Sequence, residues 1–333
     1  MKTAILPKSK AMLLQRLNSM DSQQVTDRIQ KALRNHSSSA EILFNGSLKD
    51  LGSLLSESVL KDPEFFYISG FRFRSAGSLC TVMPVYLYDK EETARLHEEC
   101  SRRAALLLKR AADKNPYETV LAFHDLLARN IEYCNDGRPE RHSIAGPFTE
   151  KKAVCDGYAK ALKYLLDHTG IENCLVHGSA WNAETGLYEP HAWNLVQLDG
   201  HWFHVDVTFD AVLGDSKILR HDYFCLTNGQ ILRDHRYECS SFPEADFSGY
   251  DYYSKFSLVM KGKETFKSRV LHCLEKGESD LIVKLPDEVS EEGLENKVTS
   301  VLNRTLLDSD IRCSYSLSFN LKQRIFHIHV MQF

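Results

Sequence analysis

The sequence predicts an α+β protein in which a bundle of helices packs against an antiparallel sheet. Apolar residues recur at helical spacing over 93–113, 117–131 and 152–167, which predicts the bundle. Strand-like runs flank the dipeptide Asp199-Gly200, which favours a two-residue hairpin turn and therefore an antiparallel pair. A shared order of short helices and strands at both ends of the chain predicts a small α/β module on each side of this core.

The first module is predicted within residues 1–92, after a helical or loose lead-in over residues 1–23. Apolar and polar residues alternate over 67–74, which is typical of a half-buried strand. The expected order is helix, strand, helix, strand and strand, over 25–33, 41–44, 48–60, 65–73 and 79–88.

The core is predicted over residues 93–250. Its second long helix begins just past Asn115-Pro116, a pair that favours a helix start. The remaining core elements are a loop over 133–150, the helix over 152–167, a strand over 173–179, a loop over 181–189 and the hairpin strands over 189–198 and 201–209.

The second module is predicted over residues 251–333, and its elements repeat the order of the first. They are expected over 266–274, 280–285, 291–306, 313–321 and 324–333. The stretch Glu41-Ile-Leu-Phe is matched by Asp280-Leu-Ile-Val, so we expect two similar modules. Short α+β segments of unrelated proteins can share such an order, which is the alternative explanation. The modules could serve substrate recruitment, self-association or support of the core.

Composition limits the class of protein. A chain of 333 residues is long enough for two or three domains, and 43% hydrophobic with 26% charged residues predicts packed cores. The net charge of −4 gives no reason to expect nucleic acid or an anionic membrane as a partner. No apolar run has the length of a membrane span, and the first residues lack the apolar run of a signal peptide. Nine cysteines without paired spacing then predict reduced thiols in a cytoplasm.

Cys155 is the candidate nucleophile. It falls at or near the start of the predicted helix, because the preceding segment contains Gly146 and Pro147 and is loop-like. Unpaired N–H groups at a helix N-terminus carry partial positive charge, which favours the thiolate, the nucleophilic form of the side chain. For a cysteine taken alone, the alternative is a buried structural role.

His191 is the candidate base, and Asp206 is the carboxylate that would orient it. With a two-residue turn, His191 faces Thr208 and Trp193 faces Asp206, so His191 and Asp206 are diagonal neighbours on one face of the hairpin. Together with Cys155 they would supply a nucleophile, a base and an orienting group. A bulge in the hairpin would break this register.

Two other roles remain open for the histidines. His204 shares the expected face with Asp206 and could compete as a partner. His177, His191, His201 and His204 with Asp206 could also be a zinc site, although zinc ligands usually come as closely spaced pairs around an open position. A triad accounts for two of these residues more simply, so we expect no metal and no cofactor.

Three motifs resemble those of the transglutaminase-like superfamily, and more closely those of the bacterial transglutaminase-like, papain-like cysteine proteins. They are Val-Cys155-Asp-Gly-Tyr-Ala, Pro-His191-Ala-Trp-Asn and Trp-Phe-His-Val-Asp206-Val-Thr-Phe-Asp. Their order and spacing fit that family, and the resemblance extends over residues 115–230. It implies a papain-like core in which Cys155 is the nucleophile, His191 the general base and acid, and Asp206 the orienting group.

The resemblance also implies thiol-dependent acyl transfer on the amide bonds of a peptide or protein substrate, with no cofactor. A cysteine peptidase or amide hydrolase is the expected function. Transglutaminase-type amine transfer and a non-catalytic peptide-binding module are the alternatives. Val154 and Asp156 stand where animal transglutaminases have Gln and Trp around the cysteine, which favours hydrolysis over cross-linking.

The oxyanion of such a reaction needs hydrogen-bond donors. We expect one to be the backbone N–H of Cys155 at the helix start. A second should come from the loop over 133–150, where Tyr133, Asn135 and His142 are the candidates.

Overall fold

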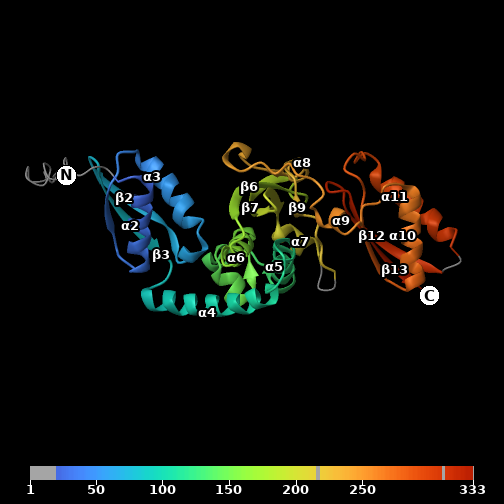
Figure 1. The fold of residues 1–333 in the computed structure, drawn as a ribbon, viewed down its shortest axis with the longest axis horizontal. Coiled ribbons are helices and arrows are strands. Elements are labelled where there is room, and N and C mark those ends of the chain that lie inside the picture. The colour runs from blue at the N-terminus through green and yellow to red at the C-terminus, as the bar shows by residue number, and fades with distance from the viewer. Residues whose placement is uncertain (1–19, 215–217, 310–311, 333) are drawn as a thin grey trace, which may run out of the picture.

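The computed structural model describes residues 20–214, 218–309 and 312–332. Three parts follow one another along the long axis of the molecule: a first module, a core and a second module (Figure 1). Helix α4 (Lys90–Leu108) extends along one side of the first module and the core. Helices and antiparallel sheets occur together in each part, so the α+β prediction is confirmed. Among the described residues, no helix is long and apolar enough to cross a membrane.

The first module contains a three-stranded antiparallel sheet in the order β1-β3-β2. Val25, Ile29 and Leu33 are buried at four-residue spacing, so the first helix turns one apolar face toward the core. The elements are α2 (Ser22–Arg34), β1 (Ala40–Leu43), α3 (Leu48–Leu55), a π-helical turn (Ser56–Leu60), a 3-10 turn (Pro63–Phe65), β2 (Ile68–Ala76) and β3 (Leu79–Tyr86).

The strand predicted from residue 65 begins only at Ile68. The Asp62 side chain accepts a hydrogen bond from the Glu64 backbone N–H, and Pro63 follows at the first position of a 3-10 turn. This capped turn delays the strand, because its backbone is helical through Phe65.

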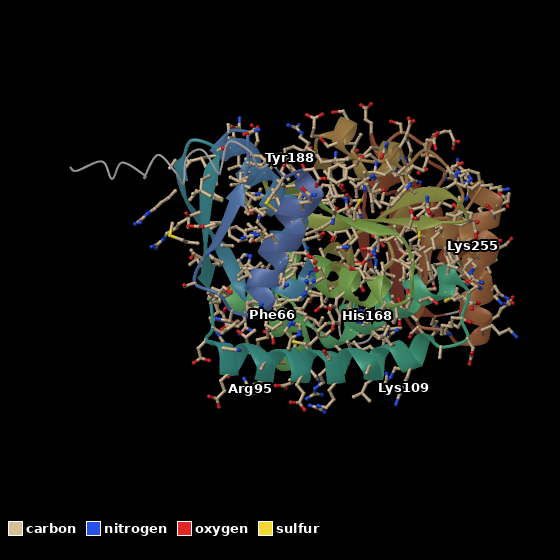
Figure 2. The ribbon with its side chains drawn as sticks, turned by 60° about the vertical axis from the view of Figure 1, so that its left-hand side comes forward. Phe66, Arg95, Lys109, His168, Tyr188 and Lys255 are labelled. Atoms are coloured by element: carbon tan, nitrogen blue, oxygen red, sulfur yellow. The ribbon has the colours of Figure 1, made fainter. Side chains whose placement is uncertain are left out.

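Helix α4 is buried on one side and solvated on the other. Leu96, Cys100 and Ala104 lie on the buried side. Arg95 of α4 and Lys109, just past its end, point away from the body of the molecule (Figure 2). Because α4 begins at Lys90, a boundary at residue 92 would cut the helix, and we propose that the first module ends before it.

The core carries a five-stranded antiparallel sheet in the order β10-β6-β7-β8-β9. Its helices and turns are α4, a 3-10 turn (Lys109–Ala111), α5 (Pro116–Asn130), 3-10 and π turns (Pro139–His142 and Gly146–Glu150), α6 (Cys155–Asp167), α7 (Val207–Leu213), α8 (Asn228–Ile231) and a 3-10 turn (Cys239–Ser241). Its strands are β4 (Glu132–Tyr133), β5 (Lys152–Ala153), β6 (Asn173–Asn182), β7 (Leu187–Leu198), β8 (His201–Val205), β9 (Phe224–Leu226) and β10 (His235–Arg236). The loop predicted over 181–189 is shorter, because β6 and β7 both extend into it.

The hairpin turn forms as predicted. Asp199 and Gly200 have φ values of 51° and 80°, as the tight turn of a two-residue hairpin requires. Leu198 pairs with His201, and the same register continues along β7 and β8.

The predicted length of the return strand is wrong. Pairing ends at Asn194 with Val205, because Asp206 leaves the sheet and caps the N-terminus of α7. His191 therefore does not face Thr208, and Trp193 does not face Asp206; on the other side of β7, His191 pairs with Gly178.

The second module has its own hydrophobic cluster, centred on residues such as Phe266, Val270 and Leu302. Its antiparallel sheet has the order β11-β13-β12. After α9 (Tyr252–Lys255), its elements are α10 (Lys263–Lys276), β11 (Asp280–Lys284), α11 (Leu294–Leu307), β12 (Cys313–Asn320) and β13 (Ile325–Gln332).

The two modules agree in detail as well as in the order of their elements. In both, the last strand lies in the centre of the sheet. The buried pair Ile42 and Cys80 corresponds to the buried pair Val283 and Phe326, so the structural match is shifted by two residues from the sequence match of Ile42 with Leu281. Just before the first helix, Met20 N–H donates to the Leu43 carbonyl at 2.9 Å, and Met260 N–H donates to the Lys284 carbonyl at 2.7 Å. We propose that the modules are two copies of one α-β-α-β-β unit.

Candidate active site

Cys155 is the first residue of α6, as predicted. Val154 precedes the helix in an extended conformation, and its N–H donates to the Arg141 carbonyl at 3.0 Å. A Cβ atom on Gly157 would lie 2.3 Å from that same carbonyl oxygen, so only glycine allows the loop to pack this closely on the first turn. The Cys155 side chain lies beside buried Ala159 and Ala192, on the side of the helix that faces the sheet.

Ion pairs fix the loop in front of the cysteine. The buried Arg141 guanidinium lies 2.9 Å from Asp136 and 3.0 Å from Glu150. The hydrogen bond from Arg141 lowers the pKa of Asp136 to about 2. Glu150 also accepts from Arg138 at 2.7 Å. The loop is thereby held at both of its ends against the start of α6.

His191 lies on β7 between two partners. Its Nε2 atom donates to Asp206 Oδ2 at 2.7 Å. Cys155 is the second group that acts on the ring, because its side chain contributes to the raised pKa of His191. Burial lowers the pKa of His191, but the charge and hydrogen bond of Asp206, with the contribution of Cys155, outweigh burial and raise the pKa to about 10.

Asp206 reaches His191 from a helix N-terminus rather than from a strand. Its Oδ1 atom accepts from the backbone N–H groups of Thr208 and Phe209, at 3.0 and 3.2 Å, and so caps α7. Its Oδ2 atom accepts from His191. Burial raises the pKa of Asp206, but the hydrogen bonds and charges of His191 and His235 lower it by more. The net pKa therefore lies well below the usual range. The carboxylate is therefore ionised and faces His191 in a fixed orientation.

His235 is a contact that the sequence analysis missed. Its Nε2 atom lies 3.1 Å from Asp206 Oδ2, the same oxygen that accepts from His191. It lies on β10, at the edge of the sheet beside Ala180 of β6. In the sequence, only the adjacent acidic and imidazole side chains of Asp234-His235 mark this position.

A comparison with protein families identifies the same part of the chain. Residues 106–207 match the model of the Transglutaminase-like superfamily, and Cys155, His191 and Asp206 all lie within that range. These residues form a transglutaminase-like domain.

Similar proteins cover only part of this chain. The kyphoscoliosis peptidase of Mus musculus is 28% identical over 134 residues, which are 35% of this chain and 20% of that protein, so the match spans a fifth of its length. The crystal structure of a TGase has a TM-score of 0.29 at 15% identity and covers 51% of this chain and 50% of its own. A putative cysteine protease from Cytophaga hutchinsonii has a TM-score of 0.28 at 18% identity and covers 42% and 62%.

His204 does not compete with Asp206 as a partner of His191. Its Nδ1 atom accepts from the Trp193 indole N–H at 2.9 Å, and its Nε2 atom lies 2.8 Å from Asn228 Oδ1. Burial lowers the pKa of His204 to about 4, so the ring is neutral and occupied by other partners.

The histidines considered for zinc do not converge. His177 lies 3.0 Å from Asp156 Oδ1 on the neighbouring helix. His201 stacks on Phe247, with 4.0 Å between the ring centroids. Neither contact involves His191.

Within residues 20–214, 218–309 and 312–332, two groups bring three possible ligand atoms together. The first is His191, Asp206 and His235. Two atoms that bind one tetrahedral zinc ion at about 2.0 Å lie about 3.3 Å apart, whereas His191 Nε2 and Asp206 Oδ2 are 2.7 Å apart. The distance fits a hydrogen bond and is too short for a shared zinc ion.

The second group is His124, Asp125 and His221. His124 Nδ1 and His221 Nε2 lie 3.1 and 2.8 Å from Asp125 Oδ1, and His124 Nε2 lies 3.0 Å from Asp210. Burial lowers the pKa of His124, but the two carboxylates outweigh it and raise the pKa to about 9. His124 is therefore a buried cation between two acids, which supports α5 and α7.

Tyr133 is the loop residue on which Cys155 acts electrostatically. It lies on β4, which runs parallel to β5, and the next residue, Cys134, donates its N–H to the Ala153 carbonyl at 2.9 Å. Burial, Cys155 and Glu189 raise the pKa of Tyr133, so the phenol keeps its proton and can donate it.

The other two candidate donors in the loop are Asn135 and His142. Their side chains are exposed, as is that of Tyr133. The His142 backbone carbonyl accepts from Lys160 at 3.0 Å. Tyr133 stands out because Cys155 contributes to its raised pKa.

Proposed function

We propose that Cys155, His191 and Asp206 are a catalytic triad for acyl transfer on an amide bond of a peptide or protein. The Cys155 thiolate attacks the carbonyl carbon, and the C–N bond breaks as His191 gives its proton to the leaving amine. Water then attacks the thioester and gives a proton to His191, which releases the acid and restores the thiolate. The function is that of a cysteine peptidase or amide hydrolase.

The observation that supports this most directly is the arrangement of partners around His191. Its Nε2 atom is held by an ionised carboxylate at 2.7 Å, and Cys155 at the N-terminus of α6 contributes to its raised pKa. A carboxylate in this position keeps the imidazole in one orientation and stabilises its protonated form. The raised pKa of His191, about 10, means that the proton needed by the leaving amine is in place at neutral pH.

The proposed oxyanion donors are the Cys155 backbone N–H and the Tyr133 hydroxyl. First-turn N–H groups have no acceptor within their own helix and point at a ligand near its start. The raised pKa of the Tyr133 phenol keeps its hydrogen available for the developing negative charge.

Hydrolysis and amine transfer share this triad and differ only in the nucleophile that resolves the thioester. Water gives an acid, whereas a primary amine gives a new amide, the transglutaminase-type outcome. A peptide-binding module needs no ionised, oriented pair of His191 and Asp206. The surroundings of Cys155, where Val154 and Asp156 depart from the animal transglutaminase motif, favour water.

The test is activity-based profiling of the full chain with a thiol-directed amide probe. Wild type and Cys174→Ala are expected to be labelled, and Cys155→Ala is expected to remain unlabelled. Cys174 is a matched control because it is half-buried on the adjacent sheet and its pKa is raised by burial. Equal labelling of Cys155→Ala, or no labelling of folded and reduced wild type, would contradict the triad.

A second measurement separates the two reactions. A peptide library is incubated with wild type in ¹⁸O-water containing a primary amine, and the products are analysed by mass spectrometry. Incorporation of ¹⁸O at a new carboxylate supports the hydrolase, whereas amine addition to glutamine side chains supports transfer.

The compartment is also a proposal. All nine cysteines are free, and four of them are buried. We propose that the protein works in a reducing compartment, a cytoplasm, where such thiols persist.

A further inference from the structure

His235 contacts the same carboxylate oxygen of the proposed triad as His191 does. Its Nε2 atom lies 3.1 Å from Asp206 Oδ2, and its Nδ1 atom lies 2.6 Å from Asp234 Oδ1. An imidazole whose two nitrogens both face carboxylates carries hydrogen on both and is a cation. Burial lowers the pKa of His235, but the hydrogen bonds and charges of Asp206 and Asp234 outweigh burial and raise it.

The ring of His235 has no freedom to turn away. Its side chain has no exposed surface. The rings of Trp193, Phe209 and Tyr223 surround it, with centroid distances of 5.1, 4.8 and 5.5 Å. Water is therefore excluded as a substitute partner for Asp206.

From His235 a chain of buried hydrogen bonds continues into the second module. Asp234 Oδ2 accepts from the Tyr223 hydroxyl at 2.6 Å. The Tyr223 oxygen in turn accepts from Asn320 Nδ2 at 3.2 Å. Asn320 is the last residue of β12, so the chain joins the triad carboxylate to the second module.

The turn between β12 and β13 is anchored where this chain enters the core. Gln323, which is fully buried, donates to the Gln230 carbonyl of α8 at 3.1 Å. Its own N–H donates to Asn320 Oδ1 at 3.2 Å, which orients the asparagine amide. Arg233 donates to the Lys322 carbonyl at 3.1 Å. The second module thus contacts the core segment that immediately precedes Asp234 and His235.

We propose that His235 is a positioning residue for the triad, and that the second module fixes it through Asn320, Tyr223 and Asp234. The inference rests on the proposed function. His191 and His235 share one carboxylate oxygen, so the His235 cation weakens the pull of Asp206 on the His191 proton. The proton can then pass to a leaving amine while Asp206 still orients the ring.

The charges around the two rings determine the sign of the expected effect. His191 is faced by Asp206, Cys155 and His235, while His235 is faced by Asp206, Asp234 and the neutral His204. The ring centroids of His191 and His235 are 5.5 Å apart. Two like charges at this distance lower each other's pKa by about one unit. Loss of the His235 cation should therefore raise the pKa of His191.

The main test is His235→Gln in the full chain, with ¹⁵N-labelled histidine followed by NMR as a function of pH. Gln keeps one donor and loses the charge. We expect the titration midpoint of His191 to rise by about one pH unit, and kcat on a peptide substrate to fall about tenfold with KM unchanged. A folded variant whose His191 midpoint stays or falls would overturn the role of His235.

The link to the second module is tested by Asn320→Ala against Asn303→Ala. Asn303 is exposed on α11 and accepts a hydrogen bond from Tyr315. Its substitution therefore disturbs the same module without affecting the hydrogen bonds that lead to His235. Asn320→Ala should shift the His191 midpoint in the same direction as His235→Gln, by less, while Asn303→Ala leaves it unchanged. If Asn320→Ala and Asn303→Ala have the same His191 titration midpoint, the second module has no part in positioning His235. Asn320→Ala also keeps the test available if His235→Gln does not fold.

The two proposals fail in distinguishable ways. If neither wild type nor any variant acts on amides, the proposed function fails. The His191 titration midpoints still decide whether His235 acts on Asp206. If wild type is active and both kcat and the midpoints are the same in all variants, the triad stands and the positioning role is wrong.

Discussion

The coupling of His191 to Asp206 predicts how the stability of the core depends on pH. The pKa of His191 rises from an ordinary value near 6.5 to about 10 in the fold. A raised histidine pKa gives stability that is fully present below the unfolded pKa and is lost as pH rises through the folded pKa. The window is therefore pH 6.5 to 10. Across it the free energy of unfolding should fall by about 1.4 kcal/mol per pH unit, and by about 5 kcal/mol in total.

The perturbation is Asp206→Asn, made in a Cys155→Ala background so that the thiol does not contribute to the measurement. The amide can still cap α7 through its oxygen, because Oδ1 is the atom that accepts from Thr208 and Phe209. It removes the charge that, with its hydrogen bond, is the largest cause raising the pKa of His191. With only burial left to act, the histidine is neutral in the fold, and its part of the slope disappears.

Urea unfolding followed by tryptophan fluorescence measures this slope. The three tryptophans, Trp181, Trp193 and Trp202, all lie on strands of the core sheet, so the signal reports on the domain that contains the site. Between pH 7 and 9, the slope of the free energy of unfolding against pH should differ between Asp206→Asn and its parent by at least about 1.4 kcal/mol per pH unit. This difference corresponds to one bound proton. Asp246→Asn, which removes an exposed carboxylate, is the matched control and should follow the parent. Parallel curves for Asp206→Asn and its parent would refute the coupling.

Three further predictions follow from the same site. Cys155 should be the first of the nine thiols alkylated by limiting iodoacetamide near neutral pH, and His191→Ala should slow it because the imidazolium is lost; mass spectrometry that finds Cys155 spared in folded protein would contradict this. Tyr133→Phe should lower kcat about a hundredfold with KM little changed, if the hydroxyl is an oxyanion donor; steady-state kinetics with an unchanged kcat would return the choice to the other loop residues. Gly157→Ala should destabilise the core by about 1–3 kcal/mol, because its Cβ would lie 2.3 Å from a carbonyl oxygen; urea unfolding should show a much smaller loss for Gly229→Ala, where the nearest atom is 3.9 Å away.

Local signals in the sequence were sufficient to place Cys155 and His191. Cys155 follows a loop and opens a helix with regular apolar spacing, so its place at the helix start depends only on its neighbours. The two-residue turn at Asp199-Gly200 fixes the register of β7 and β8 over the paired length. Both signals act over a few residues, which is the range in which sequence patterns are informative.

Asp206 was predicted to meet His191, and it does so by a different route from the one expected. The expected pairing of His191 with Thr208 requires a return strand that continues through Phe209, whereas β8 ends at Val205. An Asp followed by Val-Thr-Phe is compatible with strand and with a helix cap, because the side chain can bond its own backbone two or three residues on. Tertiary packing decided between them, which a local pattern does not encode.

The partnership of His235 with Asp206 could not be predicted from the sequence at all. The two residues are 29 positions apart, and β10 contributes only two residues to the sheet, too few for a recognisable period. Its cationic state depends on Asp234, and Asp234 is held by a tyrosine that itself contacts the second module. Each step brings together segments that no short-range pattern connects.

The two flanking modules are joined to the core by different kinds of contact, and this has consequences for the site. Residues of the first module and of the core belong to one continuous hydrophobic cluster, whose separation would expose a large apolar area. The second module has its own cluster, and polar contacts join it to the core, such as Arg233 with Asp287 at 3.2 Å and Gln230 with Asp287 at 2.8 Å. Polar contacts are directional, so small displacements change them strongly. A module held in this way can transmit its position to Asp206 through Asn320, whereas the first module can act on the site only by holding the core together.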